Sequence, residues 1–545
     1  MNANKFRSNI QSLKDRVYDV LIIGGGITGA NILWDSTLRG LKGLLVEKSD
    51  YASGTSQATS KLIHGGLRYL KNFELGLVRE SLRERRILAK ISPHAVETLG
   101  FFIPIYDMKT KFMLGAGMLM YDKLSYDKNK DISTDRLIPK YRSYSREEAI
   151  YEAPEISRAR LRGAYLYYDY TNINPERHTT EFIFSAREQG AVARNYTQVI
   201  KIARLETGNF LVDLKDVLSG ELISVESRTL VNSAGPWADY IEDMAGIKMD
   251  AKLVRSKGIH IVTRKISGNK CIVLQKRDGS HLFVIPWRNK TLIGTTDTSF
   301  NEEPDAMRVT KKEILDLIDE VNYSFGLAKL SIDDVDYFYG GLRPLVEDPG
   351  EKSDTYNASR KSEILDHKEK GLPGFFSALG GKYTTSRAVA ENLVNHLTKY
   401  LGNTNVSCTT DRTPLISGRY NTLKELVDDL QKKFPEIEGE KLETIAKRYG
   451  SQAEKILKNS RRNVYSLANY EKIYEEEIEY ICSNEDIVTA RDFYLRRSGV
   501  GIPGLPVEEE HKKIMQKLAT ILSWDKAGLE EEDRVLRACY IPKET

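Results

Sequence analysis

A short, predominantly apolar run at residues 18–23 is the first strong structural signal along the chain, and it ends in a row of glycines. Such a run is typical of a strand that is buried on both faces of a parallel sheet. Apolar residues then recur with helical spacing between Thr28 and Arg39, and Gly40 is suited to end that helix. A second apolar run at 44–47 completes a βαβ unit within about thirty residues, as a dinucleotide-binding fold requires.

The pattern changes twice further along the chain. Short β runs between residues 252 and 345 predict an antiparallel sheet that covers a site. From residue 405 onward, Glu, Lys, Leu and Arg dominate with helical periodicity, which predicts a separate helical domain over 405–545. The apolar segment 112–121 is too short to span a membrane. We expect it to pack as a buried helix, with contact to a membrane surface as the alternative.

Composition narrows the class of protein. A chain of 545 residues is long enough for two or three domains. The net charge of +4 is too small to indicate a nucleic-acid partner. The four cysteines are widely scattered, and neither they nor the histidines have the spacing of metal ligands. We therefore expect no metal site, and a reducing, cytoplasmic setting.

The glycines after the first strand match the GxGxxG pattern of dinucleotide-binding turns. Gly24 permits a tight turn, Gly26 lets the backbone approach a pyrophosphate, and Gly29 lets the helix pack close to the strand. The helix that begins near Thr28 adds partial positive charge at its N-terminus, which favours a phosphate. Glu47 ends the second strand about twenty residues later, where a carboxylate accepts ribose hydroxyls.

Hydroxyl groups crowd the segment that follows Glu47. FAD and NAD share the first motif, so this later run decides between them. Hydroxyls and backbone amides at this place can bind the pyrophosphate and the flavin end of an extended FAD. A flexible loop without a ligand is the alternative interpretation. The residues concerned are Ser53, Gly54, Thr55, Ser56, Thr59 and Ser60.

Several further segments follow the order of one known family across residues 18–400, and two more lie in the C-terminal part. These segments are 60–70, 232–239, 283–287, 293–298, 341–345, 380–387, 448–450 and 492–497. Through them the chain resembles the FAD-dependent glycerol-3-phosphate dehydrogenases, a family that includes the related α-glycerophosphate oxidases. Thr59 and Ser386 stand where the family often has Ser and Tyr, and neither change disturbs the assignment.

The resemblance implies an α/β fold in three parts. A Rossmann-like FAD-binding domain of the glutathione-reductase/D-amino-acid-oxidase type would be assembled from residues 1–90, 190–250 and 345–400. An antiparallel-sheet domain from 91–189 and 251–344 would bind the substrate, and a C-terminal helical domain would follow. A homodimer is common in such families.

The resemblance also extends the cofactor site beyond the first turn. Val199 is the expected adenine-contact position, although it would equally suit the core of a sheet. A helix starting near Thr384 would point its N-terminus at the flavin edge where reduced flavin gains negative charge. The added cofactor residues are Lys61, His64, Gly65, Val199, Ala234, Gly235, Trp237, Gly381, Lys382 and Thr384.

Three arginines are candidates for the phosphate of glycerol 3-phosphate, because guanidinium forks bind phosphate oxygens in pairs. Arg68 follows a pair of glycines, which allows close approach to a ligand. Arg343 precedes Pro344 in an apolar stretch, so solvent exposure does not explain it. The match of Arg360 to the family is looser. The alternative for each is a surface or ion-paired residue.

The reaction implied by the resemblance moves a hydride from C2 to flavin N5 while the C2 hydroxyl loses a proton. His64 is a natural candidate for the base, because its ordinary pKa is near neutrality. A structural role in the loop is the alternative. Lys382 competes: it would hold the C2 oxygen, act as the base when desolvated, or stabilise reduced flavin. Arg343 joins these two as a catalytic candidate, and Tyr69 would hydrogen-bond the substrate or only pack.

Electrons from the product-forming step would pass to a membrane quinone, with the protein attached peripherally to the inner face of the cell membrane near residues 109–123. A soluble oxidase that uses oxygen and releases hydrogen peroxide is the first alternative. Such oxidases commonly carry an added segment, and none is evident, so we favour the dehydrogenase. An amine oxidase on the same fold and a non-enzymatic flavin-binding protein fit the arginines, His64 and Lys382 less well.

Overall fold

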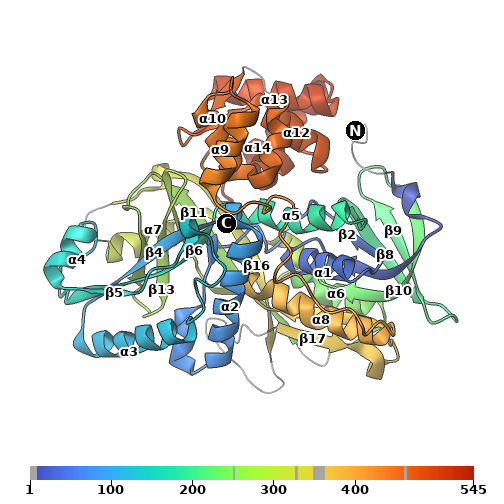
Figure 1. The fold of residues 1–545 in the computed structure, drawn as a ribbon, viewed down its shortest axis with the longest axis horizontal. Helices are drawn as coiled ribbons and strands as arrows, with labels where there is room; N and C mark the ends of the chain where they lie inside the picture. Colours follow the sequence, from blue (N-terminus) through green and yellow to red (C-terminus); the bar gives the residue numbers. More distant parts are fainter. Residues whose placement is uncertain (1–8, 249–251, 326–328, 348–361, 460–462, 545) are drawn as a thin grey trace.

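The computed structural model describes residues 9–248, 252–325, 329–347, 362–459 and 463–544. Figure 1 shows three parts: one helix-covered sheet on the right, a second sheet on the left, and a group of helices above both.

The first sheet has eight strands and contains the βαβ unit expected from the sequence. β1 (Val17–Ile23) lies parallel to β2 (Gly43–Val46) on one side and to β10 (Leu222–Asn232) on the other. Parallel strands end at the same edge of a sheet, and ligands bind in such folds at that edge. The remaining strands are β7 (Val192–Arg194), β8 (Thr197–Arg204), β9 (Phe210–Asp216), β17 (Ser362–Asp366) and β18 (Phe375–Gly380).

Helices bury one face of this sheet. α1 (Ile27–Leu38) connects β1 to β2 and packs against both α5 (Pro175–Glu188) and α8 (Ser386–Tyr400). Val20, Trp34 and Leu393 belong to the shared core. Apolar side chains of β8 and β9, which extend the sheet from β10, and of α6 (Ala238–Met244) pack together with β1 and β2 in a second core on the other face. The sheet is therefore buried on both faces, as the apolar run at 18–23 predicted.

The second sheet has ten strands and is antiparallel except where β12 runs parallel to β4. It confirms the antiparallel sheet expected over 252–345, and strands from residues 62–172 extend it. Its strands are β3 (Leu62–Ile63), β4 (Val96–Ile105), β5 (Arg142–Tyr144), β6 (Gly163–Asn172), β11 (Lys252–Thr263), β12 (Cys271–Gln275), β13 (His281–Trp287), β14 (Lys290–Gly294), β15 (Thr298–Phe300) and β16 (Val335–Glu347). Its helices are α2 (Leu75–Ile91), α3 (Met108–Leu124), α4 (Arg146–Glu152) and α7 (Lys311–Ser324).

The chain crosses between the two sheets at places that differ from the expected domain boundaries. β3 comes from the segment assigned to the cofactor domain, but it pairs with β6 of the second sheet. α5 comes from the segment assigned to the substrate domain, but it packs on α1 of the first sheet. Both differences have one cause. The chain leaves the first sheet soon after β2 to build the second sheet, and it is back at the first sheet by α5, before β7 begins.

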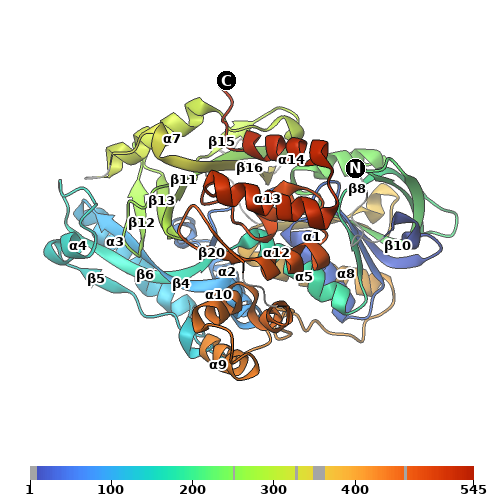
Figure 2. The ribbon, with the colours of Figure 1, turned by 90° about the horizontal axis from the view of Figure 1, so that it is seen from above.

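The C-terminal part is helical, as its periodicity predicted, with one small hairpin. Seen from above in Figure 2, it lies over the middle of the molecule, with the second sheet on one side and the first on the other. Its elements are α9 (Leu423–Lys433), α10 (Gly439–Tyr449), α11 (Ala453–Leu457), β19 (Val464–Ser466), β20 (Lys472–Tyr474), α12 (Glu475–Asn484), the π-helical turn η11 (Asp492–Arg497), α13 (Glu508–Leu522) and α14 (Lys526–Ala538).

Ion pairs join this helical domain to both sheets. Glu471 lies 2.7 Å from the Arg288 guanidinium, which sits in the β13–β14 turn of the second sheet. Glu485 pairs with Arg177 of α5 at 2.7 Å. Because these charges are largely withdrawn from water, removing one partner leaves the other uncompensated. The helical domain is thus held to the rest of the chain by charge as well as by apolar packing.

α3 forms as a helix where the apolar segment 112–121 predicted one, but the expectation that it is buried is wrong. Only Met118 and Tyr121 are buried within it. Five large apolar side chains are exposed, and Phe112 is 73% exposed. None of the described helices combines the length and the apolar character needed to cross a bilayer. The exposed residues are Met108, Phe112, Met113, Leu119 and Met120.

Glu471→Gln tests the charge contribution to this interface. Burial alone would raise the pKa of Glu471, but the Arg288 and Arg448 guanidiniums outweigh it and lower the pKa to about 2. A carboxyl with a lowered pKa stabilises the fold above its unfolded value of 4.5 and loses that contribution as pH falls toward about 2. We expect the variant to unfold with about 3 kcal/mol less free energy at pH 7.

Denaturant unfolding between pH 7 and pH 3 measures this difference, which should shrink below the unfolded pKa of 4.5. Glu509→Gln, at an exposed glutamate on α13, is the matched control. A difference between Glu471→Gln and the wild type that stays constant as pH falls would contradict the account.

Candidate functional site

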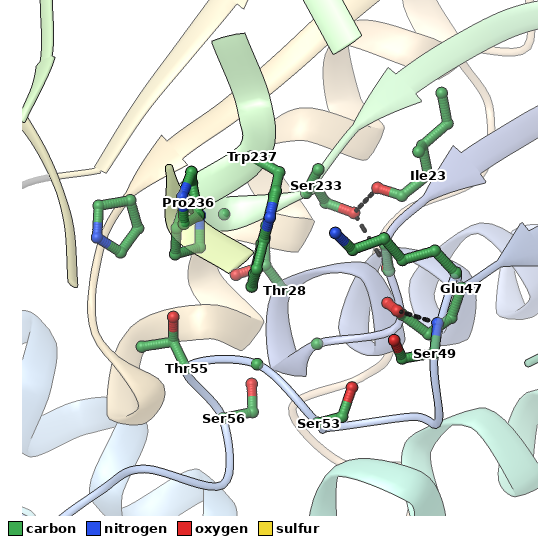
Figure 3. Close-up of a pocket in the computed structure, with 18 of the residues that line it drawn as sticks. Ile23, Thr28, Glu47, Ser49, Ser53, Thr55, Ser56, Ser233, Pro236 and Trp237 are labelled. Carbon is green, nitrogen blue, oxygen red and sulfur yellow. Dashed lines mark hydrogen bonds between the residues drawn. The ribbon is translucent and has the colours of Figure 1, made fainter. Parts of the chain in front are cut away.

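A cavity of about 740 Å³ opens at the carboxyl ends of β1, β2, β10 and β18. Its size falls within the range of about 300–1,000 Å³ that is usual for small-molecule and cofactor sites. Figure 3 shows Ser53, Thr55 and Ser56 on one wall, with Trp237 opposite them and Glu47 at the side. The cavity therefore lies where the sequence placed the dinucleotide.

The glycine turn between β1 and α1 forms the floor of this cavity. Gly24 has a φ of +107°, and Gly24, Gly26 and Thr28 all line the space. Gly29 lies behind the turn, where an added Cβ would be 2.0 Å from the carbonyl oxygen of Gly24. Only glycine allows this approach of helix to strand. The N-terminus of α1 then faces the cavity, which favours an anionic group there.

Glu47 lies at the cavity wall with its carboxylate already oriented. Its two oxygens accept hydrogen bonds from the backbone N–H groups of Gly25, at 2.7 Å, and Ser49, at 2.8 Å. Burial raises the pKa of Glu47, and these two N–H groups offset part of that effect. A carboxylate can accept up to about four hydrogen bonds, so the group retains capacity for ribose hydroxyls.

The hydroxyl-rich segment lies against the cavity, but several of its hydroxyls also bind the protein. Ser56 Oγ accepts from the backbone N–H of Ile27 at 2.9 Å, which closes the first turn of α1. Thr55 Oγ1 donates to the Leu342 carbonyl at 2.6 Å. Both residues and Thr59 line the cavity. Ser60 does not line it, and its hydroxyl lies 2.9 Å from His260 Nε2.

The wall opposite this segment follows β10. Val199, Ala234, Gly235 and Trp237 all line the cavity, and Val199 is also part of a buried core cluster. The indole N–H of Trp237 donates to Asp305 at 3.0 Å. The Lys48 ammonium lies 4.4 Å from the centre of the same indole ring. Both expectations for Val199, adenine contact and sheet core, are compatible with its position.

Lys382 marks the far end of the cavity, after the carboxyl end of β18. Gly381, with a φ of +84°, and Lys382 both line the space. The Lys382 ammonium donates to Ser81 Oγ at 3.1 Å and lies 4.0 Å from the centre of the Tyr69 ring. A facing aromatic ring favours the charged form of an amine. Thr384 is buried behind Lys382, outside the cavity lining.

His64 is half-buried outside the cavity lining, and its ring lies edge-on to Phe283 at 6.5 Å. The backbone N–H of Gly66 donates to His64 Nδ1 at 3.1 Å. A ring nitrogen that accepts carries no proton, so the neutral ring carries its proton on Nε2.

Gly65 is held by a buried chain of hydrogen bonds. Its N–H donates to the Tyr121 hydroxyl at 3.0 Å, and that hydroxyl donates to Asp169 at 2.7 Å. Asp169 in turn pairs with Arg85, and both side chains are fully buried. These hydrogen bonds fix the backbone at Gly65, just beyond the hydroxyl-rich segment.

Arg343 extends from β16 over neighbouring strands of the second sheet. Its guanidinium donates to Thr295 Oγ1 at 2.8 Å and to Ser256 Oγ at 3.1 Å. It does not line the cavity, although the next residue, Pro344, does. The side chain of Arg68 and the whole of Arg360 lie outside the described part of the chain. The structure therefore describes one of the three predicted phosphate-binding arginines.

Lys61 is placed differently from the other predicted cofactor residues. Its side chain is fully buried and pairs with Glu176 at 2.7 Å. Burial lowers the pKa of Lys61, while Glu176 acts in the opposite direction. The ammonium lies 5.1 Å from the centre of the Trp287 ring, away from the cavity lining. The side chain thus joins the cofactor segment to α5 rather than facing the cofactor.

His260 is a candidate site residue that sequence reasoning missed. It is buried, stacks on Tyr339 at 4.9 Å, and lies beside Ser60. Burial lowers its pKa well below the ordinary value, and the positive charges of Arg343 and Lys61 add to the effect. Ser256, Gly258 and His260 share one face of β11 because successive strand residues alternate. Small or polar residues at alternate positions of β11 are the sequence signal from which His260 could have been predicted as a candidate site residue.

Three cavity residues missed by sequence reasoning involve the C-terminal domain. Asp50 lines the cavity just before the hydroxyl-rich segment. Arg491 and Arg496 line it from the helical domain. The motif at 492–497 was noted only as part of a resemblance, without a role. Asp50 and the two arginines are brought together by contacts between residues that are far apart in the sequence.

Comparisons with known proteins agree with this geometry. Residues 19–395 match the family model described as FAD dependent oxidoreductase, and residues 408–528 match the C-terminal domain of alpha-glycerophosphate oxidase. A glycerol-3-phosphate dehydrogenase of Synechocystis sp. is 35% identical over 466 residues, covering 82% of each chain. An aerobic glycerol-3-phosphate dehydrogenase of Staphylococcus aureus is 30% identical over 537 residues, or 95% of this chain and 94% of that one.

Solved structures extend the comparison to the fold. The glycerol-3-phosphate dehydrogenase from Bacillus halodurans complexed with FAD is similar at a TM-score of 0.78 and 25% identity, over 98% of this chain and 97% of that one. An L-alpha-glycerophosphate oxidase from Mycoplasma pneumoniae with FAD bound has a TM-score of 0.55 at 18% identity, over 75% of this chain and 99% of that one. The latter similarity concerns the fold alone.

Gly29→Ala tests the cofactor turn. The added Cβ would lie 2.0 Å from the Gly24 carbonyl oxygen, so α1 must move away from β1. We expect FAD to bind at least about tenfold more weakly, because overpacking of this kind costs roughly 1–3 kcal/mol. Fluorescence titration of the apoprotein with FAD measures the affinity. Gly76→Ala in α2, where nothing lies within 4 Å, is the control. Wild-type affinity in Gly29→Ala would refute the role of the turn.

Proposed function

The chain belongs to the family of FAD-dependent glycerol-3-phosphate dehydrogenases and oxidases, and from that premise we propose that it oxidises sn-glycerol 3-phosphate to dihydroxyacetone phosphate. The observation that carries the proposal is the position of Lys382. Its ammonium lies at the end of the cofactor cavity, opposite Glu47 and the glycine turn, and packs on Tyr69. A fixed cation there suits a substrate whose oxygen gains negative charge as it is oxidised.

FAD, when bound, supplies the flavin ring that accepts the hydride from C2. Gly24, Gly26 and the N-terminus of α1 would hold its diphosphate, and Glu47 its ribose. The Gly381–Lys382 end of the cavity would hold the flavin. The charged Lys382 would stabilise the C2 oxygen or the reduced flavin, and the Tyr69 ring keeps this ammonium in place.

Arg343 would bind the substrate phosphate. Thr295 and Ser256 hold its guanidinium in a fixed plane, and Asp297 lies 3.6 Å from it. A pre-oriented guanidinium binds phosphate oxygens in pairs with little loss of side-chain freedom. Arg68 and Arg360 remain candidates for the same phosphate. A phosphate site of this kind favours glycerol 3-phosphate over an amino acid, whose recognition requires only a carboxylate partner.

His64 presents the N–H of its Nε2 in the neutral form, because Nδ1 accepts from Gly66. In that state it donates a hydrogen bond to a bound oxygen. Acceptance of the C2 hydroxyl proton by His64 requires the Gly66 hydrogen bond to be exchanged. Lys382 packs on the Tyr69 ring and donates to Ser81, and an amine must be neutral to act as the base. The two candidates for the base therefore differ in what each requires: an exchanged hydrogen bond for His64 and a lost proton for Lys382.

A membrane quinone is the electron acceptor that we propose, with the protein bound peripherally to the inner face of the cell membrane. The exposed apolar side chains of α3 support this proposal. Lys109 and Lys123 are exposed at the two ends of the same helix. Phe73 directly follows the short helical turn 67–72, which contacts α3, and its side chain is 80% exposed. Apolar side chains flanked by lysines favour the surface of an anionic bilayer.

Arg343→Met tests the phosphate site. We expect kcat/KM for glycerol 3-phosphate to fall by about tenfold to a hundredfold, because a charge-assisted hydrogen bond contributes about 1.5–3 kcal/mol. The FAD content should be unchanged, because Arg343 does not line the cofactor cavity. Steady-state formation of dihydroxyacetone phosphate provides the measurement. Arg264→Met, at an exposed arginine of the same sheet, is the control. An unchanged kcat/KM in Arg343→Met would exclude this role.

Phe112→Glu combined with Leu119→Glu tests the membrane and the acceptor together. The double variant should no longer sediment with anionic vesicles, and it should no longer reduce quinone dissolved in them. Reduction of a water-soluble quinone analogue should continue, because α3 lies outside the cofactor cavity. Tyr151→Glu, at an 86% exposed position on α4, is the control. Equal vesicle binding by the double variant would contradict the role of α3. Turnover that releases hydrogen peroxide without quinone would favour the soluble oxidase.

A further inference from the structure

The C-terminal helical domain contributes directly to the wall of the cofactor cavity. Arg491 and Arg496 line it together with Glu47, Ser53 and Tyr196. These last three residues belong to the end of the cavity that suits the ribose and the diphosphate. Figure 2 shows the helices of this domain over the middle of the molecule, between the two sheets. The domain is therefore placed to act on the cofactor as well as on the fold.

Arg496 and Arg497 fix η11 to the first sheet through Asp50. Arg496 Nε donates to Asp50 at 2.6 Å, although the two residues are 446 positions apart. Arg497 binds the same carboxylate with two nitrogens, at 2.6 and 2.9 Å. Asp50 and Arg497 are fully buried. Burial alone would raise the pKa of Asp50, but the two guanidiniums lower it, so the carboxylate stays ionised.

Asp492 gives η11 a second anchor. It accepts from the backbone N–H groups of Val488 and Thr489, each at 2.9 Å, and from the Tyr196 hydroxyl at 2.7 Å. Arg496 also donates to it at 2.6 Å. Arg491 immediately precedes this residue. The backbone next to Arg491 is consequently held by hydrogen bonds within its own segment and by one from Tyr196 of the first part of the chain.

Arg491 differs from its neighbours because it forms no ion pair in the described part of the chain, although burial raises the pKa of Glu532 and the charge of Arg491 acts in the opposite direction. Within the described part of the chain, no carboxylate lies at ion-pair distance from it, and its buried Nε has no hydrogen-bond partner. Glu532, which packs nearby, instead accepts from the backbone N–H of Ala490 at 2.8 Å. A buried donor without an acceptor costs roughly 1–3 kcal/mol. A ligand that accepts at this point would remove that cost.

We propose that Arg491, carried by the C-terminal domain, binds the adenosine diphosphate half of FAD. Arg491 lines the same cavity as Glu47 and the glycine turn, and the diphosphate is the anionic group that a dinucleotide places at that turn. The C-terminal domain thereby completes the cofactor site. It links cofactor retention to the docking of the helices on the two sheets.

Arg491→Met tests this assignment, because it removes the guanidinium and keeps an unbranched side chain. FAD should bind to the apoprotein about tenfold more weakly, the result of losing one charge-assisted hydrogen bond. Fluorescence titration measures that affinity. ADP, which carries only the assigned half, should lose affinity by the same factor, and riboflavin, which lacks it, should bind as it does to the wild type. Arg491→Lys should lie between the two proteins.

The melting temperature of the apoprotein separates a binding role from a structural one. It should be the same in Arg491→Met and in the wild type, because the side chain has no ion pair to lose within the described chain. Arg534→Met, at an exposed arginine of the same domain, is the matched control and should change neither quantity. Unchanged affinity for FAD and ADP would overturn the proposal. An apoprotein melting temperature lowered as much as that of the FAD-bound protein would also overturn it.

Discussion

The buried ion pair between Asp50 and the two arginines of η11 is the constraint on which the cofactor site depends. Asp50 stands three residues before the hydroxyl-rich segment, and its fully buried carboxylate binds Arg496 and Arg497. Breaking a pair of this kind leaves an uncompensated buried charge, at a cost of about 3–5 kcal/mol. The start of the segment is therefore fixed. Just beyond its end, the backbone is fixed at Gly65 by hydrogen bonds through Tyr121 to Asp169.

A segment held at both ends can present several groups at fixed positions without being rigid itself. Thr55 and Ser56 then face the cavity, while Ser60 reaches His260 of the second sheet. Lys61 continues the path into a buried ion pair with Glu176. In consequence one short stretch connects the dinucleotide turn, the substrate sheet and the helical domain. Cofactor binding and substrate orientation both depend on this stretch. A change in the turn, the sheet or the helical domain therefore affects the other two through few contacts.

Local patterns predicted the features that depend on near neighbours in sequence. The strand at 18–23, the glycine turn and Glu47 were all evident, because a βαβ unit is built from adjacent residues. The partners of Asp50 were not predictable, since Arg496 lies 446 positions away. α3 was expected to be buried because a helix that is apolar on every side has no polar face to mark solvent. The ion pair of Lys61 with Glu176 was not predictable, because a motif match does not show which way a side chain points.

The anaerobic absorbance spectrum of the purified protein, recorded before and after addition of glycerol 3-phosphate, tests the central claim most directly. It requires no acceptor and isolates the transfer from substrate to cofactor. We predict an oxidised flavin band that bleaches when glycerol 3-phosphate is added and does not bleach with glycerol alone. A flavin band that remains unchanged would contradict the substrate assignment. A folded protein that neither carries FAD nor takes it up would contradict the cofactor site itself.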